Sequence, residues 1–257
     1  MTSENFAQMF ERVLVPTIFR PWAEDLFARV QPSARERILD VGCGTGIVAR
    51  IVRERCGPSA SITGVDLNPD MIAVARGLAP DITWQQGNAV ELPFGDASFD
   101  LVLSQQALQF FPDRAAGIRE MRRVLAPGGR IALSTWRPLP ENPVYFALHE
   151  LAEARFGPNP DRRFSFGEPE PIQALLAGAG FREIEIERVT LRDRVSDPDT
   201  FVAMNLSATV DLSSLDEPKR RQAVTDFQAS ARKQIAAYLE GTALVHPVSA
   251  NVVTATA

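Results

Sequence analysis

Cysteine and histidine are scarce in this 257-residue sequence, which contains two of each. Cys43 and Cys56 form no C-x-x-C motif and are too few for a disulfide framework, so we expect two small, partly buried thiols. His149 and His246 lie far apart, and no group of residues has the spacing of metal ligands. We therefore expect no metal site.

Excess positive charge and long apolar runs are also lacking. The 27 Lys and Arg residues are outnumbered by 32 Asp and Glu residues, and the formal net charge is −5. Such a surface disfavours phosphate backbones, so we expect no nucleic-acid partner. No apolar run reaches the roughly 18 residues of a membrane-spanning helix. The first residues lack the basic and then apolar pattern of a signal peptide, so we expect a cytoplasmic location.

The stretch that organises the rest is 37–46, which reads Arg-Ile-Leu-Asp-Val-Gly-Cys-Gly-Thr-Gly. It predicts a buried strand, a tight glycine loop and an amphipathic helix, because apolar residues recur at helical spacing after Gly46. Glycine permits positive φ and lets a ligand approach the main chain closely. The free N–H groups at the start of the helix favour an anionic group there.

The spacing of the glycines separates this loop from the dinucleotide fingerprint. That fingerprint is G-x-G-x-x-G, whereas Gly42, Gly44 and Gly46 form the tighter G-x-G-x-G. With the preceding Leu-Asp-Val at 39–41, the loop resembles motif I of the class I methyltransferases that depend on S-adenosylmethionine (SAM). The alternative is a tight structural turn in another α/β protein, since such folds host many functions.

A second acid follows at the expected distance. Residues 61–66 predict a strand that ends in Asp66, and Asn68 begins the next helix as an N-cap followed by proline. In nucleotide-binding βαβ units, an acid at the end of the second strand binds the ribose hydroxyls. A carboxylate suits this role because it accepts from two neighbouring hydroxyls. The alternative is a loop aspartate without a ligand.

Residues 82–104 resemble the UbiE-like group of these methyltransferases, through a G-x-A…L-P-F…S-F-D pattern. The resemblance implies that the residue after Gly87 accepts a hydrogen bond from the adenine amino group. The group has an acid there, whereas this chain has Asn88, which accepts through its amide oxygen without the charge. Leu67 is placed to cover the adenine ring, with ordinary core packing as the alternative.

Strand and helix alternate from 37 to 136, which predicts a parallel sheet with helices on both faces. The L-x-P-G-G motif at 125–129 and the A-G-F turn at 179–181 also resemble the family. Residues 184–189 alternate Ile and Glu, which is typical of a strand with one solvent-exposed face. The family resemblance implies a last, antiparallel strand beside it, which we place at 244–256.

We therefore predict a doubly wound, Rossmann-like α/β fold with a seven-stranded, mostly parallel sheet in a single domain of residues 1–257. The SAM-binding core is 31–136, and 137–257 forms the C-terminal half of the sheet. Helical segments within 197–240 form an insertion between the last two strands, either as a lid over the strand ends or as a distal packing element.

The segment 1–30 is expected to be a helical cover, divided by Pro16 and Pro21. Its apolar residues recur at helical spacing, so it must pack on the main body. Phe19 and Trp22 either wall a substrate pocket or belong to the core.

These observations predict a SAM-dependent methyltransferase that modifies a small apolar or aromatic acceptor and releases S-adenosylhomocysteine. A SAM-binding protein without transferase activity and an NAD-dependent oxidoreductase are the alternatives, and the oligomeric state, monomer or homodimer, stays open. Ligands of open α/β sheets bind outside the carboxyl ends of the strands. We predict cofactor contacts from Asp40, Gly42, Cys43, Gly44, Gly46, Asp66, Leu67, Gly87, Asn88, Ala89, Ser104 and Gln105. The predicted substrate contacts are Phe19, Trp22, Gln106 and Tyr145. No catalytic residue is assigned; His149 and His246, as neutral imidazoles, and Tyr145 are the candidates.

Overall fold

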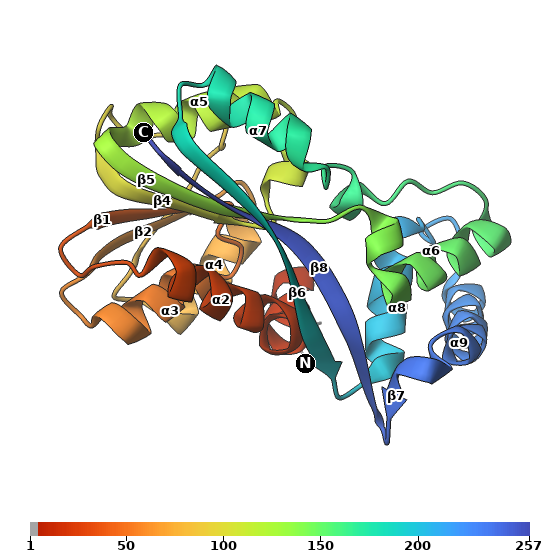
Figure 1. Cartoon of the computed structure of the whole chain (residues 1–257). Coiled ribbons are helices and arrows are strands. Elements are labelled where there is room, and N and C mark those ends of the chain that lie inside the picture. The colour runs from red at the N-terminus through yellow and green to blue at the C-terminus, as the bar shows by residue number, and fades with distance from the viewer. Residues whose placement is uncertain (1–4) are drawn as a thin grey trace.

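The computed structural model describes residues 5–257. Residues 1–4 of the predicted cover lie outside the described residues. A twisted sheet forms the centre of the molecule, with helices on both faces and a separate helical lobe at one end (Figure 1). The order of the main strands is β3-β2-β1-β4-β5-β8-β6. Their bounds are β1 (Arg37–Val41), β2 (Ser61–Asp66), β3 (Thr83–Gln86), β4 (Phe99–Gln105), β5 (Leu125–Trp136), β6 (Arg182–Val195) and β8 (Ala243–Thr256).

The sheet has the predicted mixture of strand directions. Strands β1 to β5 pair in parallel, whereas β8 runs antiparallel between β5 and β6. The doubly wound fold with an antiparallel last strand is therefore confirmed. The described chain adds one short strand to the predicted seven, since β7 (Leu239–Glu240) pairs with the start of β8. The sequence predicted helix at this position.

Helices cover the two faces because neighbouring strand residues point to opposite sides. Ile38 belongs to the core that packs against α2 (Arg20–Val30), α3 (Ile47–Cys56) and α4 (Pro69–Leu78). Leu39, the next residue, belongs to the core on the other face, under α5 (Arg114–Val124) and α7 (Pro169–Gly178). The predicted cap is present, because the Asn68 side chain accepts from the backbone N–H of Asp70 at the start of α4.

The N-terminal segment stays helical where breaks were predicted. Helix α1 (Phe6–Met9) continues through the π-helical segment Phe10–Phe19 into α2. Pro21 is the second residue of α2, at the point where the π-helical segment passes into the α-helix. Pro16 lies within the wider π-helical turns, and the Thr17 hydroxyl donates to the Val13 carbonyl at 2.7 Å. The expectation that the two prolines divide the helix is therefore wrong.

A helical lobe stands at the far end of the sheet (Figure 1). It consists of α6 (Pro143–Phe156), which follows β5, and of α8 (Pro198–Thr209) and α9 (Glu217–Gln234), which lie between β6 and β8. Asp197 and Asp216 cap α8 and α9, each accepting from a backbone N–H three residues later. Phe201 of α8 and Phe227 of α9 are fully buried in the lobe. No helix among residues 5–257 is long and apolar enough to cross a membrane.

Candidate functional site: a cavity at the carboxyl ends of the strands

A cavity of about 820 Å³ lies at the carboxyl ends of the central strands and extends to the lobe. Its floor comes from the segments that follow β1, β2, β3 and β4, together with Trp136 at the end of β5. One wall comes from α1 and the π-helical segment, and the opposite wall from α8. This is the position at which open α/β sheets bind ligands.

The glycine loop exposes its main chain to the cavity at Gly44. Gly44 has a φ of +55°, and a Cβ built on it would meet only one ring atom of Phe10, at 4.0 Å. Gly46 has a different role, because a Cβ there would lie 2.2 Å from the Trp84 ring. Gly46 does not line the cavity. The loop therefore combines a surface for a ligand at Gly44 with a close contact between Gly46 and Trp84 of β3.

Asp66 lines the cavity at the end of β2 and accepts two backbone hydrogen bonds. One oxygen accepts from the N–H of Gly44 and the other from the N–H of Asn68, each at 2.8 Å. A carboxylate has about four lone-pair positions, so each oxygen can accept a second bond. The residue thus ties the glycine loop to the end of β2 and keeps capacity for two adjacent hydroxyls of a ligand.

Asp40 lies beneath the loop and is almost completely buried. One of its oxygens accepts from the Ala49 N–H at 3.2 Å, and the other has no partner among the described residues. Burial, with the nearby Asp66 charge as a smaller cause, raises the pKa of Asp40 to about 7. Its carboxyl braces the start of α3 and also faces the cavity.

The loop after β3 forms the side of the cavity next to β2. Gly87, Asn88 and Ala89 line it, as does Leu67, whose residue is 63% exposed. The Asn88 side-chain oxygen accepts from the Val90 N–H at 3.2 Å, which leaves one lone pair on that oxygen. The residues predicted at the adenine edge thus lie together on one side of the cavity.

The end of β4 contributes two buried glutamines. Gln105 donates to the Phe19 carbonyl at 2.9 Å, and its amide oxygen has no partner among the described residues. Gln106 has a φ of +53°, and both polar atoms of its buried amide lack partners there. Strained backbone and buried polar atoms without a protein partner cluster at functional sites, and the Gln105 and Gln106 amides keep bonding capacity for a ligand. Both residues line the cavity.

Three predicted contacts lie away from the cavity: Gly46, Ser104 and Trp22. Ser104 is buried and donates to the Val41 carbonyl at 2.9 Å. Trp22 packs in the core with its ring edge-on to Trp136, at 5.4 Å between centroids. Phe19, one helical turn earlier, does line the cavity. The core alternative therefore describes Trp22, whereas the pocket-wall hypothesis fits Phe19.

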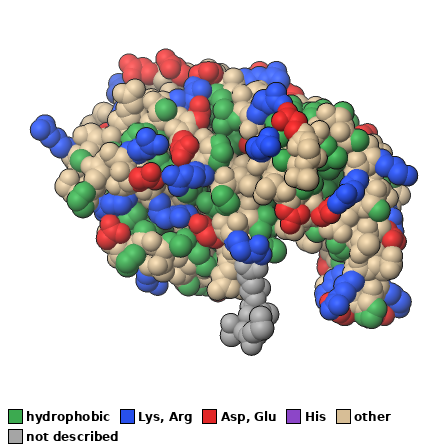
Figure 2. Space-filling view, turned by 90° about the horizontal axis from the view of Figure 1, so that it is seen from below, with side chains coloured by type: hydrophobic (Ala, Val, Ile, Leu, Met, Phe, Trp, Pro, Cys, Tyr) green, Lys and Arg blue, Asp and Glu red, His purple; other side chains and the backbone are tan. Residues whose placement is uncertain are grey.

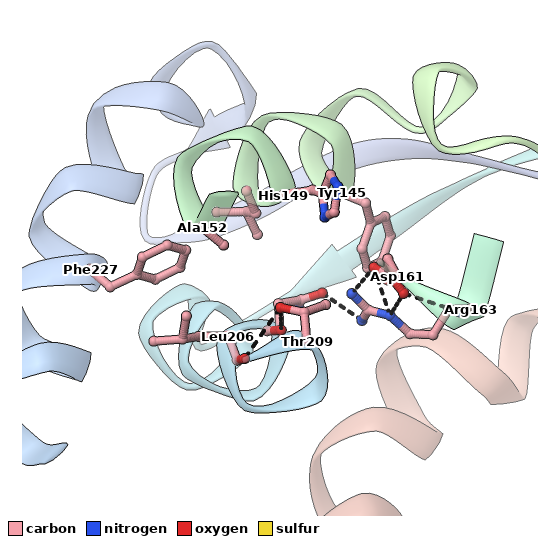
Figure 3. Close-up of a pocket in the computed structure, with 10 residues that line it drawn as sticks. Tyr145, His149, Ala152, Asp161, Arg163, Leu206, Thr209 and Phe227 are labelled. Carbon is pink, nitrogen blue, oxygen red and sulfur yellow. Dashed lines mark hydrogen bonds and ion pairs between the residues drawn. The ribbon is translucent and has the colours of Figure 1, made fainter. Parts of the chain in front are cut away.

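The three catalytic candidates occupy different surroundings. Tyr145 lines the large cavity, whereas His246 is fully buried and lines neither cavity. Burial lowers the pKa of His246 to about 4, so it is neutral at pH 7. His149 lines a small second cavity enclosed by α6, α8 and α9 (Figure 3). No histidine among residues 5–257 lines the large cavity.

Apart from Tyr145 of α6, the sequence missed the part of the site that comes from the lobe. Arg163 and Phe164, in the turn after α6, line the large cavity together with six residues of α8. These α8 residues are Thr200, Ala203, Met204, Asn205, Ser207 and Ala208. These residues are far in the sequence from the strand-end motifs, and α8 carries no motif of its own, so the sequence pattern did not reveal them. Seen from below, the surface is hollowed between the body and the lobe, and acidic and basic side chains are interspersed (Figure 2).

The strand order, the glycine loop and the acid at the end of β2 define a Rossmann-like fold with a nucleotide-type site beyond its strand ends. Residues 39–133 match the Methyltransf_11 family, described as a methyltransferase domain. Demethylmenaquinone methyltransferase of Deinococcus radiodurans is 32% identical over 193 residues, which cover 68% of this chain and 79% of the relative. UbiE, the ubiquinone/menaquinone biosynthesis C-methyltransferase of Geotalea daltonii, is 30% identical over 200 residues, covering 70% and 85%. The chain belongs to the SAM-dependent methyltransferases of the UbiE type.

Solved structures agree on the fold. The YcgJ protein of Bacillus subtilis superimposes with a TM-score of 0.62 and 21% identity, covering 91% of this chain and 97% of that one. Phosphoethanolamine N-methyltransferase 2 of Haemonchus contortus, solved in complex with SAM, has a TM-score of 0.59 and 20% identity, covering 92% and 52%. An NAD-dependent oxidoreductase and a protein without transferase activity are not favoured by these comparisons.

Proposed function

We propose that this chain transfers a methyl group from SAM to a small apolar or aromatic acceptor, and that both molecules share the large cavity. The observation that carries this proposal is the continuity of one cavity, from Asp66 and the glycine loop to the aromatic side chains of the lobe. Because the walls of the cavity come from the N-terminal segment, the core and the insertion, we also propose that residues 1–257 act as a single domain.

The donor would occupy the strand-end half of the cavity. Asp66 would accept from the ribose hydroxyls, Asn88 and Ala89 would lie at the adenine edge, and Leu67 would cover the ring. The backbone at Gly42, Cys43 and Gly44, which lines the cavity, would adjoin the ribose and methionine parts. The fit is supported by the remaining lone pairs of Asp66 and the unpaired oxygen of Gln105.

When bound, SAM supplies an electrophilic methyl group on a sulfonium. The contribution of this chain is to orient the acceptor and to exclude water, and orientation alone reaches effective molarities of roughly 10⁵–10⁸ M. Phe19 and Tyr145 would hold an apolar or aromatic body, and Gln106 would bind a polar substituent of the acceptor.

The acceptor class follows from the lining and from the relatives. Apolar side chains of Phe10, Leu14, Ile18 and Met204 dominate the walls. The relatives named above are a demethylmenaquinone methyltransferase and a C-methyltransferase of ubiquinone/menaquinone biosynthesis. We propose a small aromatic molecule as the acceptor, with no nucleic acid as a partner. A cytoplasmic location stays a prediction.

Calorimetry of SAM, S-adenosylhomocysteine and NAD against the purified protein tests the proposal. We expect micromolar binding of the two sulfur compounds and none of NAD. Binding of NAD alone would contradict the assignment. A protein that binds SAM but methylates no member of a panel of small aromatic acceptors would favour the binding-only alternative. Mass spectrometry of the denatured sample shows whether a ligand co-purified.

A further inference from the structure

Arg163 lies where the body of the protein meets the lobe, and it lines both cavities. Figure 3 shows its guanidinium between Asp161, in the same turn, and α8. Its Nε and Nη2 atoms donate to the Asp161 carboxylate, at 2.9 Å and 2.6 Å for the shortest contacts. Its Nη1 atom donates to the Asn205 side-chain oxygen at 2.7 Å.

This arrangement leaves donors for a ligand. A guanidinium carries five N–H groups, and three of them donate to these two residues of the described chain. One N–H on each terminal nitrogen remains. The Asp161 side chain is only 2% exposed, whereas that of Arg163 is 24% exposed. The fixed fork can therefore bind an oxygen without first reordering the side chain.

The charges along the large cavity are separated. Asp40 and Asp66 lie at the strand-end half, and Arg163 is the only Lys or Arg that lines the cavity among residues 5–257. Asp161 contacts the small cavity but does not line the large one. Arg163, but not Asp161, thus presents its charge to the large cavity, from the lobe side rather than from the strand ends that carry Asp40 and Asp66.

Aromatic rings flank the same guanidinium. Its Cζ atom lies 5.4 Å from the centre of the Tyr145 ring and 5.6 Å from that of Phe164. The two rings contact each other, with centroids 5.2 Å apart. An aromatic acceptor packed against these rings would present a substituent to the two remaining N–H groups.

We propose that Arg163 binds a negatively charged oxygen of the acceptor, so that the cavity selects apolar or aromatic acceptors bearing a carboxylate or a phenolate. This inference deepens the proposed function and rests on it. Where that oxygen is itself the methylated atom, the C–O bond forms as the S–CH₃ bond of SAM breaks, S-adenosylhomocysteine leaves, and no proton has to be removed from the acceptor.

A matched pair of fluorescent probes tests the charge preference. 1-Anilinonaphthalene-8-sulfonate and neutral N-phenyl-1-naphthylamine share one skeleton and differ in the anionic group. Both are titrated into protein saturated with S-adenosylhomocysteine, so that the donor half is filled. The variants are Asp161→Asn, which keeps the turn-capping oxygen but removes the competing charge, and Asp161→Asn with Arg163→Gln, which leaves no unpaired buried ion. Arg162→Gln, at an exposed neighbour, is the control.

We expect Asp161→Asn to raise the affinity for the sulfonate about tenfold and the double variant to lower it about tenfold, with little change for the neutral probe. The control should match the wild type for both probes. Equal changes for both probes, or no sulfonate binding to the saturated protein, would overturn the inference. Failure of S-adenosylhomocysteine to bind would instead overturn the proposed function.

A competition experiment separates the two oxygen sources. 2-Naphthoate and 4-nitrophenolate are each used to displace the bound sulfonate probe at pH 8, from wild type and from the double variant. Stronger displacement from the wild type by one of them supports the inference and identifies a carboxylate or a phenolate acceptor. Equal displacement from both proteins, or none, overturns it.

Discussion

Removing the Asp66 carboxylate is the most direct perturbation of the donor half. In Asp66→Ala, a bound ribose would lose an ionised acceptor, which weakens binding by roughly 1.5–3 kcal/mol. This range corresponds to a dissociation constant for SAM raised about tenfold to a hundredfold. The same change also leaves the N–H groups of Gly44 and Asn68 without their 2.8 Å partners. The glycine loop is therefore expected to loosen as well.

A thermodynamic cycle separates ribose binding from loop support. Calorimetry is carried out with S-adenosylhomocysteine and with its 2′,3′-dideoxy analogue, on wild type and on Asp66→Ala. If Asp66 accepts hydrogen bonds from the ribose, the wild type should bind the dideoxy analogue about tenfold or more weakly than S-adenosylhomocysteine. The variant should bind the two ligands with nearly equal affinity. Asp70→Ala, at an exposed acid four residues later, serves as the control.

The reasoning would be refuted by either of two results. One is that the wild type and Asp66→Ala lose affinity by the same factor when the ribose hydroxyls are removed from the ligand. The other is an affinity of Asp66→Ala for SAM within twofold of the wild type, with circular dichroism showing an intact fold. In both cases Asp66 would serve only to tie the loop to β2.

Three further outcomes concern Gly46, Gln106 and Asp193, a fully buried acid of β6. Gly46→Ala should lower the free energy of unfolding by about 1–3 kcal/mol in urea, because its Cβ would lie 2.2 Å from Trp84; unchanged stability would show that the ring moves aside freely. Gln106→Gly should raise stability by about 1 kcal/mol, through relief of the positive φ, while acceptor turnover falls; a loss of stability would contradict this. Burial raises the pKa of Asp193 to about 8, so the folded protein binds a proton there that the unfolded chain releases from about pH 4 upward. This contribution to the free energy of unfolding should therefore decrease as the pH rises from 4 toward 8, so the wild type should lose stability relative to Asp193→Asn over that range; identical urea profiles for the two proteins would exclude this account.

The sequence predicted the sheet because its signals are local. The strand at 37–41, the glycine loop and the acid at 66 lie within one βαβ unit, where spacing limits the geometry. The strand predicted at 184–189 is longer in the structure, at Arg182–Val195, because its outer half pairs with β8 beyond the end of β5. The residue pattern of one segment carries no information about a pairing strand that lies about 50 residues away in the sequence.

The cavity was only half predictable for a related reason. Residues that follow the strands were found from the rule that ligands bind at strand ends, and ten of the twelve predicted cofactor contacts line the cavity. Helical periodicity placed both Phe19 and Trp22 on buried faces without showing which face meets a ligand. Arg163 and the residues of α8 enter the site only through tertiary packing. Their roles depend on contacts between segments that are distant in the sequence.

The outer parts of β6 and β8 give the protein a modular layout. Pairing between β5 and β8 ends at Trp136 and Ala250, whereas β6 and β8 continue together through the pairs from Thr190–Ser249 to Val195–Leu244. This two-stranded extension carries the insertion away from the glycine loop. An exchange of residues 196–242 would replace one wall of the acceptor half and leave the β1–β4 strand ends in place. Acceptor range could then diverge, in evolution or by grafting, while the donor chemistry is inherited unchanged.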